Sequence, residues 1–222
     1  MLYAITDRRL YGANEAQARA RLVEQASTWA ANGVAFIQLR EKDLSARDQV
    51  ELARAMLREI RSGQPSSHAP HFTKLLINGR ADVALAAGAD GVHLPSGAGA
   101  LSPDEIRKIF AAAGRMQPPI LSVSCHTLQE VDATRLLKPD CILFAPVFEK
   151  SILATEEQEA KILPGTGLEL LQQACQIAVP IPVFALGGVT AENAAECLRA
   201  GAAGIAAIRL LQEPASVWRH LV

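Results

Sequence analysis

The hydrophobic positions of the chain fall into short apolar runs that alternate with longer segments of helix-forming residues. Residues 74–97 show this unit most clearly. Apolar residues at 75–77 predict a buried strand, residues 80–87 predict a helix, and Gly88 stands where a helix C-terminus takes a left-handed conformation. Residues 91–94 then form a second strand. Strand, helix and parallel strand thus fit into about twenty residues, which is a compact βαβ unit.

The same alternation covers the whole chain. Apolar runs predict strands at residues 2–6, 35–39, 75–77, 91–94, 119–124, 141–144, 181–186 and 204–208. Helical segments are predicted at residues 15–32, 45–61, 80–87, 167–177, 192–200 and 210–221, with two more beginning at Ser102 and Thr127. Residues 62–72 are expected to be an exposed linker that holds His68 and His71, and residues 149–165 a long polar loop.

Eight strand–helix units of roughly 28 residues predict an α/β fold, a (β/α)8 TIM barrel. We expect residues 1–222 to form a single domain. A doubly wound open sheet is the alternative fold, but no Gly-x-Gly-x-x-Gly pattern follows the first strand. In a barrel the active site lies at the C-terminal ends of the strands.

Composition narrows the class of protein. The chain has 222 residues, of which 50% are hydrophobic, enough for a sizeable core. Its formal net charge of −1 argues against a nucleic-acid partner. No apolar run is long enough to cross a membrane, and the first residues do not resemble a signal peptide. We therefore expect a cytoplasmic protein. Its four widely spaced cysteines favour buried reduced thiols over a metal site or disulfides.

Polar residues at the C-terminal ends of the predicted strands are the candidates for a functional site. They are Asp7, Gln38, Arg40, Lys42, Asn78, His93, Ser96, Ser122, Ser124, His126, Lys161, Gly187, Gly188 and Arg209. Alternate residues of a strand share a face, so Ser122, Ser124 and His126 are predicted to point into the barrel. Imidazole can accept and donate protons near neutral pH, which makes His126 a candidate acid–base group. Two alternatives stay open: His126 as a residue beside a helix N-cap that bonds only main chain, and His93 as either a site residue or a satisfied core residue.

Gly187 and Gly188 end the seventh predicted strand and precede a helix. Without side chains, their main-chain N–H groups can approach an anion, and barrels commonly bind phosphate in the loops after strands seven and eight. Arg40, Lys42 and Lys161 offer further positive charge. The pattern therefore predicts a phosphate site at this end of the barrel.

Several motifs, in order along nearly the whole chain, resemble the thiamine phosphate synthase/TenI superfamily. They are YAITD (3–7), IQLREKDL (37–44), LIN (76–78), AAGADGVHL (86–94), SCHT (124–127), FAPVF (144–148) and ALGGVT (185–190). The resemblance implies a TIM barrel that acts in thiamine biosynthesis on a thiazole phosphate, and it allows a homodimer. Neither a nucleic acid nor a membrane is an expected partner.

The superfamily has two main branches. Its synthases join a pyrimidine diphosphate to the thiazole phosphate, and they hold Mg²⁺ with one Asp after the third-strand Asn and another after the fourth strand. This chain has Gly79 at the first place, and the segment containing Ser96 has no acid at the second. It is therefore more similar to TenI, a metal-independent thiazole tautomerase, whose histidine at the end of the fifth strand matches His126. The expected activity is that of an isomerase with no metal and no cofactor, Mg²⁺ being required only if the protein is a synthase.

The resemblance also implies roles for individual residues. His126 is expected to carry the proton. The phosphate is expected to lie against Gly187, Gly188 and the main chain at Ile208 and Arg209. Arg209 stands where the family usually has a small residue, so it either adds a phosphate contact or obstructs one. Arg40 is expected to face the substrate carboxylate, and the remaining predicted substrate contacts are Gln38, Lys42, Asn78, Ser124 and Lys161. The alternative functions are a thiamine phosphate synthase with an altered metal site and a non-catalytic thiazole-phosphate binder or regulator.

Overall fold

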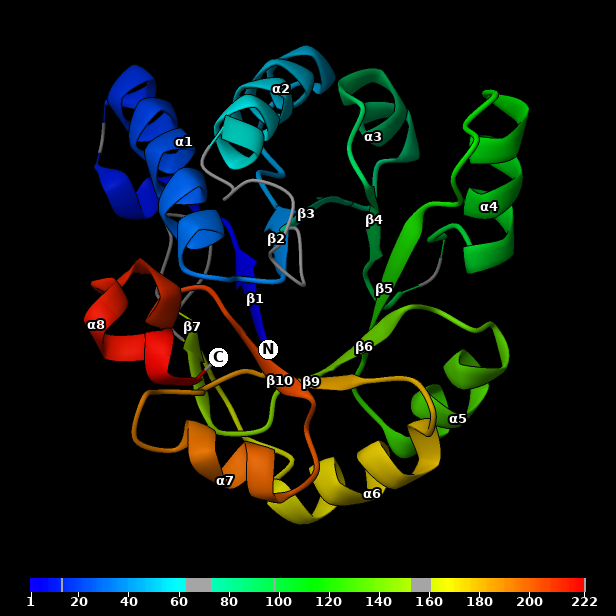
Figure 1. Cartoon of the computed structure of the whole chain (residues 1–222). Helices are drawn as coiled ribbons and strands as arrows, with labels where there is room; N and C mark the ends of the chain where they lie inside the picture. Colours follow the sequence, from blue (N-terminus) through cyan, green and yellow to red (C-terminus); the bar gives the residue numbers. More distant parts are fainter. Residues whose placement is uncertain (13, 63–72, 98, 153–160, 222) are drawn as a thin grey trace.

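The computed structural model describes residues 1–12, 14–62, 73–97, 99–152 and 161–221. Eight parallel strands close into a barrel (Figure 1), in the order β1-β10-β9-β6-β5-β4-β3-β2. Their bounds are β1 (Leu2–Ile5), β2 (Phe36–Leu39), β3 (Lys74–Asn78), β4 (Gly91–Leu94), β5 (Ile120–Cys125), β6 (Cys141–Phe144), β9 (Val183–Leu186) and β10 (Gly204–Ala207). All eight C-terminal ends therefore open at one mouth.

Helices surround the barrel as an outer ring (Figure 1). They are α1 (Glu15–Ala31), α2 (Ala46–Ser62), α3 (Ala81–Ala87), α4 (Pro103–Ala112), α5 (Leu128–Leu136), α6 (Leu168–Ala178), α7 (Ala194–Arg199) and α8 (Ala215–Trp218). Three 3-10 turns are η1 (Arg8–Tyr11), η2 (Leu210–Gln212) and η3 (Arg219–Leu221). The predicted (β/α)8 TIM barrel is confirmed. None of the helices described is long and apolar enough to cross a membrane.

Local signals in the sequence set several helix ends. Ser102 caps α4 in a reciprocal capping box with Glu105, and Pro103 occupies the first helical position. Thr127 caps α5 by accepting a hydrogen bond from the Glu130 N–H. Gly88 ends α3 in the left-handed conformation, with φ of 75°. These short-range interactions explain why the boundaries of α3, α4 and α5 follow from sequence.

Alternation along the strands divides the core into two layers. Leu2 and Ala4 of β1 pack outward with the helices, whereas Tyr3 and Ile5 point into the barrel. The interior layer consists of Tyr3, Ile5, Leu76, Cys141, Leu143, Phe184 and Ala206. Apolar side chains thus fill most of the barrel interior, with the buried polar side chains of Ser122 and His93 among them.

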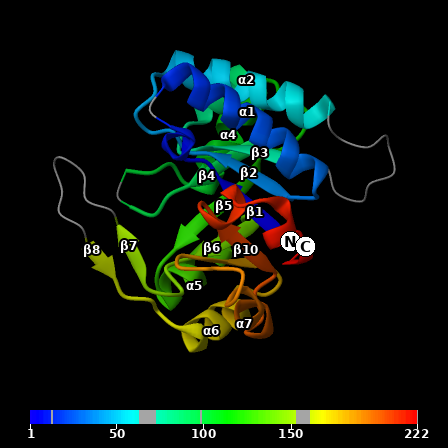
Figure 2. The same ribbon diagram turned by 90° about the vertical axis from the view of Figure 1, so that its left-hand side faces the viewer.

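Several elements differ from prediction, most of them by one or two residues at an end. The expected loop 149–165 contains an antiparallel hairpin, β7 (Lys150–Ile152) and β8 (Lys161–Leu163), which projects from the barrel (Figure 2). The expected final helix is broken into η2, α8 and η3. Pro214, which lacks an N–H group and cannot continue a helix, separates η2 from α8. The helix predicted at 192–200 begins only at Ala194. Most of the predicted linker, including His68 and His71, lies outside the described residues.

Candidate functional site at the barrel mouth

An amide pair lies at the ends of β2 and β3. The Gln38 Nε2 group donates a hydrogen bond to Asn78 Oδ1 at 2.9 Å. Gln38 Oε1 is buried and has no donor among the described residues. A buried carbonyl oxygen without a partner costs free energy, so a ligand N–H or O–H at this point would be stabilising. The structure therefore brings two predicted substrate contacts, Gln38 and Asn78, together.

Two cations follow β2. Arg40 is half-buried and Lys42 is exposed. The charge of Arg40 lowers the pKa of Lys42, so the two cationic groups repel each other. Within the described part of the chain, neither forms an ion pair with an acid. An anionic ligand would relieve this repulsion, which makes the pair a candidate binding site for phosphate or diphosphate.

His93 joins a buried chain of hydrogen bonds in the barrel. Its Nδ1 lies 2.7 Å from Ser122 Oγ, and its Nε2 lies 3.0 Å from Ser124 Oγ. Tyr3 OH is 2.8 Å from the same Ser122 hydroxyl. Burial, together with the charge of Arg40, lowers the pKa of His93 to about 3, so the ring is neutral at physiological pH. His93 is thus a satisfied buried residue that also orients Ser124 at the edge of the mouth.

His126 lies just beyond β5 and is exposed. Its Nδ1 is 2.5 Å from the main-chain oxygen of Ala145, and its Nε2 is 2.7 Å from Ser96 Oγ. A carbonyl only accepts, so Nδ1 carries a hydrogen and donates it to Ala145, while Nε2 forms a hydrogen bond with the Ser96 hydroxyl. One nitrogen therefore bonds main chain, as the alternative interpretation expected, while the other meets a polar side chain from the loop after β4.

A cavity of about 620 Å³ opens beside the ends of β9 and β10, lined by Gly187, Gly188, Ile208 and Arg209 among others. Gly187 and Gly188 have φ of 95° and 66°. A Cβ on Gly188 would lie 2.5 Å from the Glu149 main-chain oxygen, so this turn requires glycine. The N–H groups of Gly187 and Gly188 bond no acceptor among the described residues. The four predicted phosphate contacts thus share one cavity that offers free donors.

Four carboxylates also line this cavity, of which sequence reasoning identified only Asp7 as a candidate. They are Asp7, Glu149, Glu192 and Glu213. Their signal was weak because they follow four different elements, and only Asp7 directly follows a barrel strand. Arg209 is exposed on the same wall and supplies positive charge among these acids. For Lys161, the structure places the main chain in β8 and does not describe the side chain.

The residues present do not fit a carboxylate-held Mg²⁺ ion. Gly79 and Ser96 stand where the resemblance implies acids. The acids nearest in sequence to Lys42, Glu41 and Asp43, are both bound to Arg8. Across the described ranges, no three His, Cys, Asp or Glu side chains gather to hold a metal ion. Mg²⁺ prefers carboxylates together with substrate phosphates, and the two positions at which the resemblance implies those carboxylates hold none.

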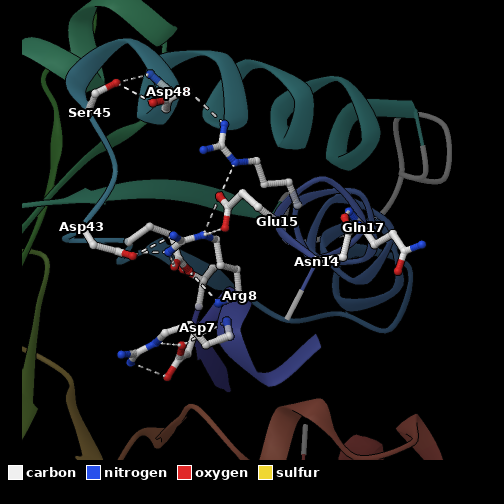
Figure 3. A network of polar contacts seen from close by, with 12 residues as sticks. Asp7, Arg8, Asn14, Glu15, Gln17, Asp43, Ser45 and Asp48 are labelled. Carbon is white, nitrogen blue, oxygen red and sulfur yellow. Dashed lines mark hydrogen bonds and ion pairs between the residues drawn. The ribbon is translucent and has the colours of Figure 1, made fainter. Parts of the chain in front are cut away.

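A buried ion cluster at the ends of β1 and β2 was also missed (Figure 3). Arg8 contacts the carboxylates of Glu15, Glu41 and Asp43. Glu15 is seven residues from Arg8. Glu41 and Asp43 are more than thirty residues from Arg8, and the parallel pairing of β1 with β2 brings them to it. The alternating charges at residues 40–43 were visible in the sequence, but nothing in that segment indicated that Arg8 would bind its two acids.

Comparisons with known proteins agree along almost the whole chain. The family model for thiamine monophosphate synthase matches residues 2–211. A protein of Geobacter sulfurreducens is 40% identical over 93% of this chain and 84% of its own length, and its name gives thiamine-phosphate synthase as a provisional assignment. The thiamine-phosphate synthase of Albidiferax ferrireducens is 34% identical over 95% of this chain and 83% of its own. Thiamine phosphate pyrophosphorylase from Pyrococcus furiosus is a structural neighbour with a TM-score of 0.74 and 26% identity, covering 99% of this chain and 94% of that one.

These findings correct the expected activity. The prediction of a thiazole tautomerase, an isomerase, is wrong, because the relatives carry the name of a synthase, which is a transferase. That prediction depended on Gly79, Ser96 and His126. Missing acids at two positions weaken one kind of metal site, but they do not by themselves decide which reaction the remaining surface supports. Fold, motifs and relatives agree at the level of the family, and the chain belongs to the thiamine monophosphate synthase family.

Proposed function

We propose that this protein is a thiamine-phosphate synthase, which joins a pyrimidine diphosphate to a thiazole phosphate. The names of its relatives support this assignment. The observation that carries it is a pair of anion-binding features at one barrel mouth. One is the cationic pair Arg40 and Lys42 after β2. The other is the turn after β9, where the N–H groups of Gly187 and Gly188 bond no acceptor in the part of the chain that the structure describes. A reaction between two phosphorylated substrates needs two such places.

Each feature suits one substrate. Arg40 and Lys42 bind the diphosphate, since two neighbouring cations that form no ion pair with any described residue match its higher charge. Gly187, Gly188 and the main chain at Ile208 and Arg209 bind the single phosphate in the cavity. Positioning both substrates between these points would bring their reacting atoms together, which lowers the entropy cost of the reaction.

Neutral polar groups occupy the rim around the two anion sites. Gln38 contacts the substrate through the amide oxygen that has no partner among the described residues, and Asn78 lies beside it. Ser124 contacts the substrate from the end of the His93 chain. His126, held by Ser96 and Ala145, serves as a further contact at this edge. Lys161 remains a proposed contact from the hairpin.

The family implies Mg²⁺, and the donor set described above does not supply the carboxylates that would hold it. We therefore assign no protein residue to a metal and give the cationic side chains the task of binding the diphosphate. Synthesis measured with added Mg²⁺ and with excess EDTA would determine whether the ion is needed.

The purified protein, incubated with both substrates, is expected to form thiamine phosphate. Lys42→Ala should raise KM for the pyrimidine diphosphate, because it removes a charge-assisted contact of about 1.5–3 kcal/mol, or roughly 10- to 150-fold. Lys108→Ala is the matched control, since it deletes the same charge from an exposed position on α4. Thiazole-phosphate binding without product, with or without Mg²⁺, would overturn the synthase assignment in favour of a non-catalytic binder.

A further inference from the structure

Lys42 lies in a tight turn directly after β2. The Leu44 N–H donates to the Glu41 main-chain oxygen at 3.2 Å, so Lys42 and Asp43 are the two central residues of a four-residue turn. Only this turn, and not a strand or helix, carries the Lys42 side chain. Whatever holds the turn therefore sets where the ammonium group can reach.

Arg8 contacts the turn on both sides of Lys42. Figure 3 shows its contacts with Asp43 and Glu15. Arg8 Nη1 donates to Glu41 Oε2 at 2.9 Å and to Asp43 Oδ1 at 2.8 Å, and its Nη2 donates to Asp43 Oδ2 at 2.7 Å. Its Nε donates to both carboxylate oxygens of Glu15 on α1. A planar guanidinium suits this task, because it binds a carboxylate through two parallel hydrogen bonds.

The cluster continues into the strand ends. Thr6 Oγ1 donates to Glu41 Oε1 at 2.6 Å, and the Arg8 main-chain N–H donates to the same oxygen at 3.1 Å. The Arg40 N–H donates to Thr6 Oγ1 at 2.9 Å. Arg8 and its partners thus hold the main chain immediately before and after Lys42. The cluster contains no substrate-binding side chain itself.

We propose that Arg8, acting through Glu41 and Asp43, is a positioning residue that fixes the turn presenting Lys42 to the anionic substrate. This inference rests on the proposed function, in which Lys42 binds the diphosphate. A turn held in advance loses less conformational entropy when the ligand arrives, so binding is tighter than the charge of Lys42 alone would give.

Charge and position make opposite predictions for Asp43. Its carboxylate sits one residue from Lys42, and hydrogen bonds from Arg8 hold its pKa at about 2, so it is ionised at neutral pH. If only charge mattered, Asp43→Asn would remove a negative group and tighten anion binding. If position matters, Asp43→Asn loosens the turn and weakens binding. Whether Asp43→Asn tightens or weakens anion binding therefore distinguishes the effect of its charge from the effect of its position.

The test is pyrophosphate binding measured by calorimetry on the full chain. Asp43→Asn is expected to raise the Kd roughly 2- to 12-fold, the cost of one side chain that must be ordered on binding. Glu15→Gln is the matched control, since it removes a half-exposed Arg8 partner that belongs to α1 and not to the turn. It should leave the Kd within about twofold. The melting temperatures of both variants report whether either has lost its fold.

A double variant separates positioning from a general structural effect. In a Lys42→Ala background, Asp43→Asn should cause no further loss of pyrophosphate binding, because the group it positions is gone. The proposal would be overturned if Asp43→Asn bound pyrophosphate as tightly as the wild type or more tightly, or if Glu15→Gln weakened binding as much as Asp43→Asn does. It would also be overturned if Asp43→Asn weakened binding equally with and without Lys42, or if the wild type did not bind pyrophosphate. The synthesis assay judges the proposed function separately, because pyrophosphate binding does not depend on turnover.

Discussion

Replacing Arg8 by Met removes the cation that neutralises a buried carboxylate while keeping a long side chain in its place. The Arg8 side chain is 7% exposed and that of Glu41 is 2% exposed. The other two acids differ, since Asp43 is 61% exposed and Glu15 is 50% exposed. The loss should therefore come mainly from Glu41, which would be left as an uncompensated charge in the protein interior.

The size of the effect follows from this difference in burial. Breaking a buried pair by removing one partner costs about 3–5 kcal/mol. The exposed partners add only about 0–1 kcal/mol each, because solvent screens them. For a chain of this length, about 2–4 °C of melting temperature corresponds to each kcal/mol, so Arg8→Met should melt roughly 6–20 °C below the wild type.

The pH dependence has a definite sign. Arg8 lowers the folded-state pKa of Asp43 to about 2, below its ordinary value of 3.8. A depressed carboxyl pKa adds stability above the unfolded value, and that stability is lost as the pH falls through the folded value. Arg8→Met lacks this contribution. The difference in the free energy of unfolding between wild type and Arg8→Met should therefore become smaller as the pH falls from about 4 to about 2.

Urea unfolding of both proteins at pH 7 and pH 3 measures the free energies directly. Adding Glu41→Gln to Arg8→Met should recover about 1–3 kcal/mol, because it removes the stranded charge. A loss under about 1 kcal/mol, or no recovery in the double variant, would refute the reasoning that Glu41 depends on Arg8 for its burial.

Two further predictions concern the barrel mouth. Gly188→Ala should raise KM for the thiazole phosphate at least about 10-fold, since its Cβ would lie 2.5 Å from a main-chain oxygen beside the cavity. Gly88→Ala is the control, because Gly88 also has a positive φ, 75°, but a Cβ there would have nothing within 4 Å. It should cost only about 1 kcal/mol of stability and leave KM unchanged. If both variants changed KM equally, the Gly187–Gly188 turn would not be the phosphate site. Burial lowers the pKa of His93 to about 3, so its ring should show constant NMR shifts from about pH 5 to 8. The stability that comes from keeping this ring neutral should be lost as the pH falls from 6.5 toward 3. An NMR titration midpoint near 6.5 would refute a buried neutral ring.

Prediction from sequence succeeded where the signal was local. Ser102, Thr127 and Gly88 act on groups within a few residues of themselves, so their roles follow from the neighbouring letters. Strand periodicity placed Ser122 and Ser124 on one inner face, where both contact His93. The break at Pro214 was visible in the sequence and was overlooked. The expected reaction was wrong because it depended on two missing acids, which describe one metal site and not the whole mouth.

The sequence by itself determined the barrel and the order of its units, because apolar period and turn residues repeat along the chain. Its motifs, and not that period, pointed to the family to which it belongs. Only the tertiary structure decided which polar groups meet. The pairing of β1 with β2 places Arg8 against Glu41 and Asp43, across more than thirty intervening residues. The closed sheet also sets the Gly187–Gly188 turn and the cations after β2 at one mouth. Such contacts depend on strand register and on closure of the barrel. Both join segments that are distant in sequence, so neither segment alone carries a pattern that predicts the contact.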